Sequence, residues 1–520
     1  MIGRSRFAPQ LALSAVLLLG ACASLPEGFD RPVSYVFTDT DNTALAAASL
    51  EKSRGHPGES GFHLLGNGHD AFVARAVLAD TAERSIDAQY YILNRDLTGR
   101  LFVDRLLRAA DRGVRVRLLV DDMDIADKEL ALLAADSHPN MEVRMFNPFA
   151  RNVGRAGQFV TRFSEVGRRM HSKSFTVDNQ VAILGGRNIG DEYFAADPAL
   201  EFADLDAMAI GPVVEQVSTA FDEYWNSELA YPASVLATRL PTEQEVEKAR
   251  AWLTDFVESQ ADSDYLLALR NSGLANAIRN RAVDYYWGDG WVAYDPPEKL
   301  LEEIGSSERH LSGQLRPLLQ TVREELIIFS PYFVPGEQGV VNLSALSERG
   351  VRVRLLTNSL ASNDVLIVHA GYLKSRKPLL RAGVEIYELN SELLNEQRRI
   401  VRGGGSTKAS LHAKSFVFDR KSVFIGSLNL DPRAIDFNTE IGFVVDSPEL
   451  AGDMSREFDE RIEQVAFRLE LVRDDSGTET LLWHGLVDGE PEVFDYEPHA
   501  SVWQRFAANF LSLFPIEGQL

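Results

Sequence analysis

The sequence predicts an α/β protein built from two copies of one structural unit, and two repeated patterns carry this prediction. The octapeptide RGVRVRLL occupies residues 112–119 and recurs at residues 349–356, 237 positions later. The pattern H-x-K-x4-D-x6-G-[GS]-x-N begins at His171 and recurs at His412, 241 positions later. Because the two offsets are nearly equal, each half contains the same elements in the same order.

The elements of the unit can be predicted in order. Residues 85–91 and 326–333 read as apolar strands that run into polar loops. Each RGVRVRLL copy then predicts a helix that ends near its glycine, followed by a buried strand. After a long insertion, alternation places His171 and Lys173 on one face of a further strand. The apolar runs that follow end at glycine, which lets the backbone approach a ligand.

The repeated motif supplies the groups that phosphodiester chemistry requires. Lysine and asparagine side chains can donate hydrogen bonds to anionic phosphate oxygens. Imidazole has an unperturbed pKa of about 6.5, so one copy can attack phosphorus while the other, protonated, serves as the acid. The same acid then removes a proton from the incoming alcohol or water, and this scheme needs no metal and no cofactor. The candidate catalytic residues are His171, Lys173, Asp178, His412, Lys414 and Asp419, and the candidate substrate-binding residues are Gly186, Asn188, Ser427 and Asn429.

Carboxylates are expected beside the histidines. Aligning residues 207–212 with residues 443–448 places Asp204 opposite Glu440. Either carboxylate can accept a proton from the second ring nitrogen of a histidine and so orient the ring. Asp178 and Asp419 belong to the motif, but we expect buried structural hydrogen bonds from them rather than proton transfer.

The duplicated motif resembles that of the phospholipase D superfamily, and more of the chain is similar to the cardiolipin synthase branch, in particular its C-type synthases. The stretches that carry the resemblance are residues 56–58, 87–92, 146–149, 168–171, 185–191, 357–360, 363–365, 369–372 and 431–433. The resemblance implies two pseudo-symmetric phospholipase D-like halves, each a mixed β-sheet flanked by helices, with one active site at their interface.

The resemblance also implies a reaction. It predicts a phosphatidyltransferase that forms cardiolipin through a phosphatidyl-histidine, with phosphatidylglycerol as acceptor and a second phospholipid as phosphatidyl donor. By the family pattern His171 is the nucleophile and His412 is the acid and base. A hydrolytic phospholipase D that releases phosphatidic acid is the main alternative. A nuclease and a catalytically inactive lipid-binding envelope protein are further alternatives.

Composition and the amino terminus predict where the protein works. A net charge of −23 argues against an extended nucleic-acid footprint. Arg4 and Arg6 precede an apolar run at residues 11–19, which is typical of a secretory signal. Cys22 is the only cysteine and ends a lipobox-like stretch, so we expect lipidation there and a membrane-anchored protein that faces the periplasm. Ala23 leaves inner and outer membranes open.

The expected organisation is a signal peptide at residues 1–21, a tether at 22–60, the first half at 61–235, a connection at 236–300, the second half at 301–465 and a tail at 466–520. Aromatic residues in the connection are expected to pack against a domain rather than against lipid. Apolar residues recur at helical spacing from Val502 to Phe514, which fits membrane docking and intramolecular packing equally. Three aspartates at 121–124 favour helix capping or solvation over a cation site.

Overall fold

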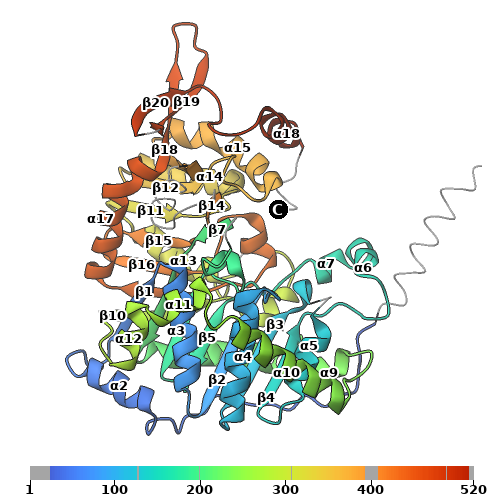
Figure 1. The fold of residues 1–520 in the computed structure, drawn as a ribbon. Coiled ribbons are helices and arrows are strands. Elements are labelled where there is room, and N and C mark those ends of the chain that lie inside the picture. Colours follow the sequence, from blue (N-terminus) through green and yellow to red (C-terminus); the bar gives the residue numbers. More distant parts are fainter. Residues whose placement is uncertain are drawn as a thin grey trace, which may run out of the picture.

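Two α/β units share one run of hydrogen-bonded strands. The structure is a computed structural model that describes residues 24–125, 128–197, 200–305, 307–392, 408–487 and 489–514. The predicted signal peptide and Cys22 lie outside the described residues. The first unit, blue to green, lies against the second unit, yellow to red (Figure 1). Each unit contains a mixed sheet with helices on its faces, which confirms the predicted pair of halves.

The first unit contains an eight-stranded sheet. Its strands in spatial order are β9 (Ala230–Pro232), β4 (Met141–Phe146), β3 (Arg115–Asp121), β2 (Ser85–Tyr90), β5 (Ser174–Val177), β6 (Val181–Gly185), β8 (Asp206–Ile210) and β1 (Ser60–Leu65). Strands β4, β3 and β2 are parallel, and every other pair is antiparallel. The strand predicted at residues 85–91 is therefore central, buried by neighbours on both sides.

The second unit repeats this order and polarity. Its strands are β18 (Ala466–Arg473), β13 (Glu385–Leu389), β12 (Arg352–Asn358), β11 (Glu325–Phe329), β15 (Ser415–Phe418), β16 (Ser422–Gly426), β17 (Ile441–Asp446) and β10 (Tyr286–Tyr294). Strands β11, β12 and β13 are the parallel set. Both RGVRVRLL copies thus form the middle strand of a parallel trio, β3 in one unit and β12 in the other.

Strand β10 joins the two sheets. Its residues Tyr286 to Gly288 pair with β1, and Asp289 to Tyr294 pair with β17. The expected connection at 236–300 therefore supplies a strand to the sheet as well as linking the units. The expected tail at 466–520 likewise begins with β18, followed by β19 (Glu479–Val487) and β20 (Glu490–Phe494), which project away from the body (Figure 1).

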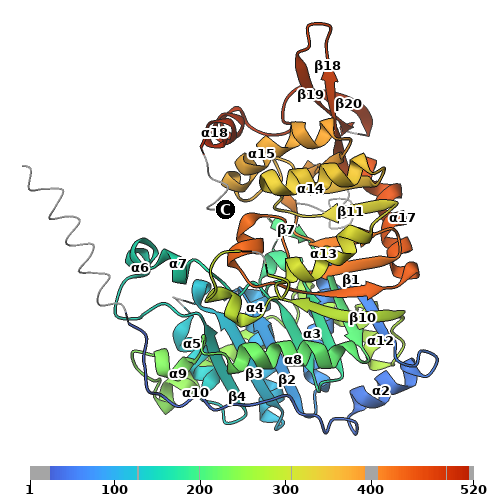
Figure 2. The same ribbon diagram turned by 180° about the vertical axis from the view of Figure 1, so that it is seen from behind.

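Helices cover both faces of each sheet. On one face lie α3 (Gly68–Thr81), α4 (Leu97–Asp111) and α5 (Glu129–Asp136) in the first unit, and α13 (Leu311–Thr321), α14 (Gly336–Glu348) and α15 (Leu366–Arg381) in the second. On the other face lie α8 (Val213–Asn226) and α17 (Pro448–Val465). Figure 2 shows α8 crossing the strands of the first sheet from behind. Residues of α8 and α17 share one buried hydrophobic cluster, which packs the units together.

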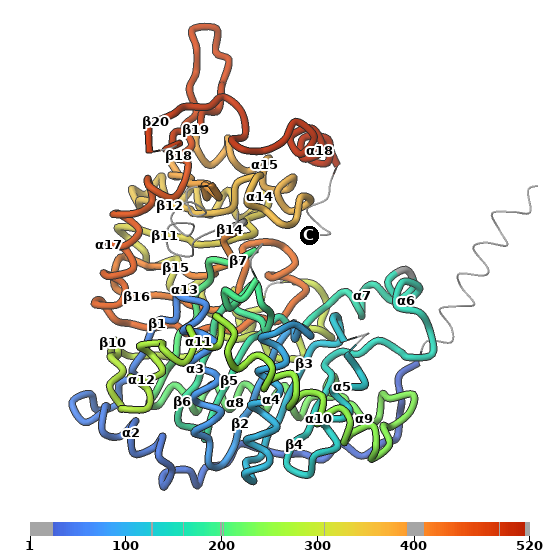
Figure 3. The backbone as a smooth tube through the Cα atoms, in the orientation of Figure 1, coloured from blue at the N-terminus to red at the C-terminus, as the bar shows by residue number. Residues whose placement is uncertain are grey.

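The remaining elements are peripheral or short. They are α2 (Ala44–Ser53), α6 (Arg155–Thr161), α7 (Phe163–Val166), α9 (Ala233–Leu236), α10 (Glu243–Ser259), α11 (Asp264–Arg270), α12 (Gly273–Arg279), α18 (Val502–Ser512), β7 (Leu200–Ala203), β14 (Lys408–Leu411), and short turns at Asp122–Asp124, Asp191–Tyr193, Pro297–Leu300 and Arg433–Phe437. Figure 3 traces the chain from the hairpin of β19 and β20 into α18, which returns to the body beside α15. None of the helices in the described residues is long and apolar enough to cross a bilayer.

Candidate active site

Backbone pairing between the two units sets up the site. The residue before His171, Met170, forms a parallel bridge with Thr439, and the His171 amide donates to the Thr439 carbonyl at 2.8 Å. The second copy repeats this arrangement, since β14 pairs in parallel with β7 and the His412 amide donates to the Ala203 carbonyl at 2.8 Å. Each histidine therefore lies directly beside the carboxylate residue of the opposite unit.

The histidine–carboxylate pairs are crosswise. His171 Nδ1 lies 2.9 Å from both carboxylate oxygens of Glu440. His412 Nδ1 lies 2.5 Å from Asp204 Oδ2. All four side chains are buried. When Nδ1 carries the proton and donates it to the carboxylate, Nε2 of a neutral ring is left as the reactive nitrogen.

The two lysines lie against the backbone of their own histidines. Lys173 Nζ donates to the His171 carbonyl at 2.5 Å, and Lys414 Nζ donates to the His412 carbonyl. Lys414 Nζ is also 2.9 Å from His412 Nδ1. His171 and Lys173 precede β5 rather than lying in it as predicted, because the backbone at residue 171 pairs with the opposite unit.

Burial shifts the pKa of every ionisable group at this centre. Burial and the nearby lysines lower the pKa of His171 well below its usual value, and they also lower that of His412. Burial lowers the pKa of Lys414 to about 8 and that of Lys173 well below its usual value. The buried site therefore disfavours the positive charge of each lysine, and a bound anion offsets this effect.

The two carboxylates differ in charge state. Burial raises the pKa of Glu440 to about 7. Burial also acts to raise the pKa of Asp204, but the interactions with His412 and Lys414 outweigh it and lower this pKa to about 2. Asp204 therefore keeps its negative charge at neutral pH, whereas burial favours the protonated form of Glu440 much more strongly. This difference makes the two halves of the site chemically unequal.

Gly186 and Ser427, expected to bind substrate, lie against the two carboxylates and position them. Ser427 Oγ donates to Glu440 Oε2 at 2.5 Å and accepts from the Ile441 amide at 3.0 Å. At the equivalent position, a Cβ on Gly186 would lie 2.2 Å from Asp204 Oδ1, so only glycine leaves room for that carboxylate. The substrate-binding role expected for Gly186 and Ser427 stays a prediction beside these contacts.

The asparagines of the motif are also unequal. Asn188 Oδ1 accepts from the Ile92 amide at 3.2 Å, and its Nδ2 donates to the Tyr193 hydroxyl at 3.0 Å. Its amide is thus already engaged by the protein. Asn429 Oδ1 is buried without a hydrogen-bond partner among the described residues. Of the two asparagines, Asn429 is the one whose side chain retains unused hydrogen-bonding capacity.

The motif aspartates lie at the far ends of β5 and β15 from the histidines. Asp178 accepts from the amides of residues 83–85 at 2.7 to 3.2 Å, and Asp419 accepts from those of residues 323–325. Both residues have a positive φ, 52° and 51°, in a turn. They therefore fasten the starts of β2 and β11 through structural hydrogen bonds, and their place among the candidate catalytic residues stays a prediction. Asp419 is partly exposed, unlike the buried role expected for it.

Two positioning residues were missed, although they end the repeated strands. Asp121, the last residue of β3, accepts from the Met170 amide at 2.9 Å. Asn358, the last residue of β12, accepts from the Leu411 amide at 2.9 Å. Each therefore holds the residue immediately before a histidine. Their equivalent positions, two residues after each RGVRVRLL copy, were the available signal in the sequence.

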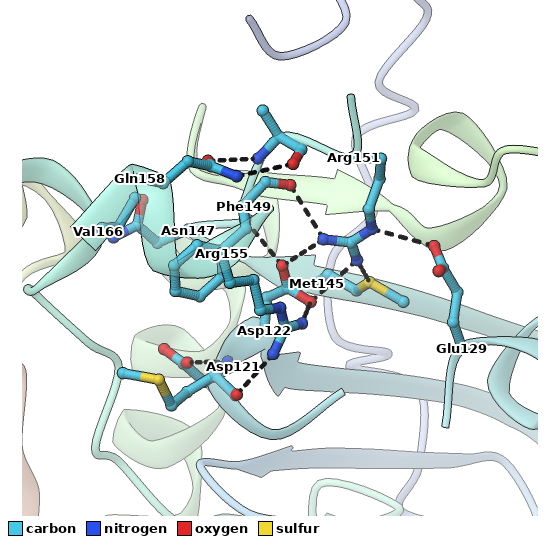
Figure 4. A network of polar contacts seen from close by, with 12 residues as sticks. Asp121, Asp122, Glu129, Met145, Asn147, Phe149, Arg151, Arg155, Gln158 and Val166 are labelled. Atoms are coloured by element: carbon cyan, nitrogen blue, oxygen red, sulfur yellow. Dashed lines mark hydrogen bonds and ion pairs between the residues drawn. The ribbon is translucent and has the colours of Figure 1, made fainter. Parts of the chain in front are cut away.

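Arginines neutralise the aspartate cluster beside this site (Figure 4). Asp122 accepts from Arg151 at 2.6 Å and from Arg155 at 3.2 Å. Asp121 accepts from Arg169 at 3.1 Å. Asp121 also caps the following turn through the Met123 amide, which confirms the capping prediction. No group of metal-ligating side chains is found within the described ranges. The cluster therefore stiffens the loop at the end of β3.

Aromatic rings enclose the histidines, and sequence reasoning had not selected them. The Tyr91 ring lies 5.1 Å from the His171 ring, edge to face. Phe202 stacks on His412 at 4.9 Å, and Tyr193 contacts the same ring at 5.2 Å. These contacts limit the rotation of both imidazoles.

Comparison with known proteins agrees with this geometry. The family described as "Cardiolipin synthase, PLD-like domain" matches residues 77–225 and 315–462, one match in each unit. Cardiolipin synthase C of Escherichia coli (strain K12) is 40% identical over 478 residues, 91% of this chain and 99% of that protein. Cardiolipin synthase B of Salmonella typhimurium is 25% identical, over 74% of this chain and 75% of that protein.

Solved structures share the fold. The crystal structure of phosphatidylserine synthase from Haemophilus influenzae Rd KW20 aligns with a TM-score of 0.53 at 14% sequence identity, covering 81% of this chain and 92% of that one. At this identity the likeness concerns the fold alone. The two family matches, the extent of the E. coli relative and the paired histidines agree, and the chain belongs to the cardiolipin synthase family of phospholipase D-like enzymes.

Proposed function

We propose that this enzyme is a phosphatidyltransferase that forms cardiolipin through a phosphatidyl-histidine, with phosphatidylglycerol as acceptor. The observation that carries the proposal is the crosswise pairing of each histidine with a carboxylate of the opposite unit. Two oriented imidazoles in one buried site are what a double displacement at phosphorus needs. One ring forms the covalent bond, and the other moves the protons.

The charge states favour His171 as nucleophile. Its pKa lies well below the usual value because of burial, so the ring is neutral and its Nε2 lone pair is available. Nε2 attacks phosphorus, and the bond from phosphorus to the donor headgroup oxygen breaks. The two lysines offer positive charge to the phosphate oxygens as charge develops on them.

The anionic Asp204 favours His412 as the acid and base. The negative charge of Asp204 acts to raise the pKa of His412 and so opposes the lowering that burial and Lys414 cause. His412 gives a proton to the departing alkoxide and then takes one from a hydroxyl of phosphatidylglycerol. That oxygen attacks phosphorus, the bond from phosphorus to His171 breaks, and cardiolipin leaves.

The proposal is tested by the products of the purified enzyme. Mixed vesicles of phosphatidylglycerol and a second phospholipid should yield cardiolipin, detected by mass spectrometry of extracted lipids. Isotope-labelled acyl chains on one lipid identify the donor. Phosphatidic acid as the sole product would indicate hydrolysis and refute the transfer reaction. His171→Ala and His412→Ala serve as matched inactive controls.

The membrane anchor is part of the same proposal. We infer lipidation at Cys22 from the lipobox-like sequence, which would tether the enzyme to the envelope with its site facing the periplasm. Labelled fatty acid should be incorporated into the wild type and not into Cys22→Ser. Equal labelling of both proteins would remove the anchor assignment.

A further inference from the structure

The carboxyl-terminal helix α18 presents an exposed aromatic face. We define the aromatic face of α18 by six apolar side chains, all of them exposed: Val502, Trp503, Phe506, Phe510, Leu513 and Phe514. Trp503 is 72% exposed and Leu513 is 79% exposed. Successive rings contact one another along the helix: Trp503 is stacked on Phe506 at 5.6 Å, and Phe510 meets Phe514 edge to face at 5.3 Å. An apolar strip of this kind on a soluble surface marks an interaction site.

The opposite face of α18 is the one that packs against the protein. Ala508 is buried in a small cluster with Leu360 and Ala500, against which Leu373 of α15 also packs. One face of α18 therefore packs against the protein, and the other face is exposed. Packing is one of the two uses that fitted the sequence equally. The aromatic face of α18 is left for a partner outside the described part of the chain.

The fold holds this face in a fixed orientation. Just before the helix, Glu497 forms a buried ion pair with Arg376 of α15 at 2.5 Å. Arg376 also pairs with Glu388 of β13 at 2.8 Å. A capping box at Ser501 and Gln504 then starts the helix. Because the approach segment is pinned to the second unit, the helix cannot easily roll its rings inward.

We propose that the aromatic face of α18 inserts into the interfacial layer of a phospholipid bilayer and holds the active site at the membrane. The helix has 11 residues, about 16 Å in length, and so lies along a surface rather than crossing it. Tryptophan and phenylalanine on one face are typical of interfacial helices. This inference rests on the proposed function, because that function requires two lipid substrates from a bilayer.

Charge favours a lipid surface as the occupant. The chain carries a net charge of −23, yet residues 502–514 contain no acidic residue and one arginine, Arg505. Arg505 lies over the Tyr496 ring at 4.7 Å, at the border of the aromatic face. A neutral to basic strip in an acidic protein can approach anionic phospholipids without the repulsion that other surfaces would meet.

The first unit also carries an exposed aromatic residue on a peripheral helix. Figures 1 and 2 place the pair α6 and α7 on the same lateral side as α18 in both views. Phe163, the first residue of α7, is exposed.

A local fluorescent probe tests the proposal. Cys22→Ser removes the only cysteine of the full-length chain, and Leu513→Cys then places a single thiol on the aromatic face. An environment-sensitive label at residue 513 should brighten and shift to the blue with vesicles of phosphatidylglycerol and phosphatidylethanolamine. The same label at Ser476→Cys, exposed in the turn between β18 and β19, should not change. Both labelled proteins carry Cys22→Ser and differ only in the position of the thiol, so a difference between their responses reports on contact at residue 513 and not on membrane contacts elsewhere.

The outcomes separate docking from catalysis. Replacing Trp503, Phe506 and Phe510 with serine should reduce the vesicle response at residue 513 at least ten-fold, while activity on detergent-dispersed lipids stays within two-fold. No vesicle response at residue 513 would overturn the proposal, even if the enzyme forms cardiolipin. A response that needs no lipid and rises with protein concentration would indicate a second copy instead and would also overturn it. A clear vesicle response at residue 513 from an enzyme that makes no cardiolipin would support membrane docking and refute only the proposed function.

Discussion

Replacing Asp204 by asparagine should separate the two chemical steps of the reaction. Asp204 Oδ2 lies 2.5 Å from His412 Nδ1, and both side chains are buried. Asparagine keeps the shape and can still accept the Nδ1 proton, but it removes the negative charge. The protonated form of His412 then loses its counter-charge, so the pKa of the ring falls and less of it carries the proton that the departing alkoxide needs.

The size of the effect follows from the geometry. For charge centres about 4 Å apart and an effective dielectric constant of about 20, the lost attraction is about 4 kcal/mol. A barrier raised by that amount lowers the rate about 10³-fold. We therefore expect Asp204→Asn to lower kcat for cardiolipin formation by about 10³, with the thermal unfolding temperature close to that of the wild type.

An activated donor reveals which step is affected. A phosphatidyl ester of p-nitrophenol needs no proton on its leaving group, so Asp204→Asn and His412→Ala should release one burst of nitrophenol and then stall. The covalent phosphatidyl-histidine at residue 171 should accumulate and be seen by mass spectrometry. Glu440→Gln changes the partner of the proposed nucleophile His171, so the activated donor should not restore a nitrophenol burst in this variant. A burst from His171→Ala together with none from His412→Ala would refute the assignment and reverse the two roles.

Three further predictions follow from the site. Lysine is cationic below its pKa, and burial lowers the pKa of Lys414 to about 8, so kcat/KM should fall as pH rises through about 8. Lys414→Arg should be slower than the wild type but should lack this alkaline decline. An unchanged decline in that variant would exclude Lys414 as its source. Asn358→Ala removes the acceptor of the Leu411 amide and should lower kcat about 10-fold without unfolding the protein. Asn358→Asp should recover activity, because aspartate is the residue at the equivalent position 121. Equal rates in the wild type and both variants would contradict a positioning role. Asp178→Ala leaves the amides of residues 83–85 without their acceptor and should lower the free energy of unfolding in urea by about 3 kcal/mol. Asp178→Asn should lower the free energy of unfolding by a smaller amount. Unchanged stability in Asp178→Ala would refute the proposal that Asp178 fastens β2.

The sequence predicted the repeated elements because their signals are local. Glycine at a helix end and an apolar run of strand length identify β3 and β12 without reference to any distant residue. The length of the histidine strand was not predictable in this way. Its first residues pair with the opposite unit through Thr439, so β5 begins at Ser174.

The candidate site was predictable in its residue types and not in its partnerships. Alignment of the two halves identified Asp204 and Glu440 as carboxylates near the histidines, but it could not tell which histidine each would contact. The roles of Gly186 and Ser427 depend on how close those carboxylates come. Such distances are properties of the packed interface and leave no trace in local spacing.

The amino-acid sequence by itself determined that there are two units, that each carries one histidine and one lysine, and that the tail has an amphipathic helix. These features depend on residues a few positions apart. Only the tertiary structure decided that His171 meets Glu440, 269 positions away, that His412 meets Asp204, 208 positions away, and that α18 turns its rings outward. The physical reason is that hydrogen bonding and burial depend on distance in space, which the pairing of two separately encoded sheets sets.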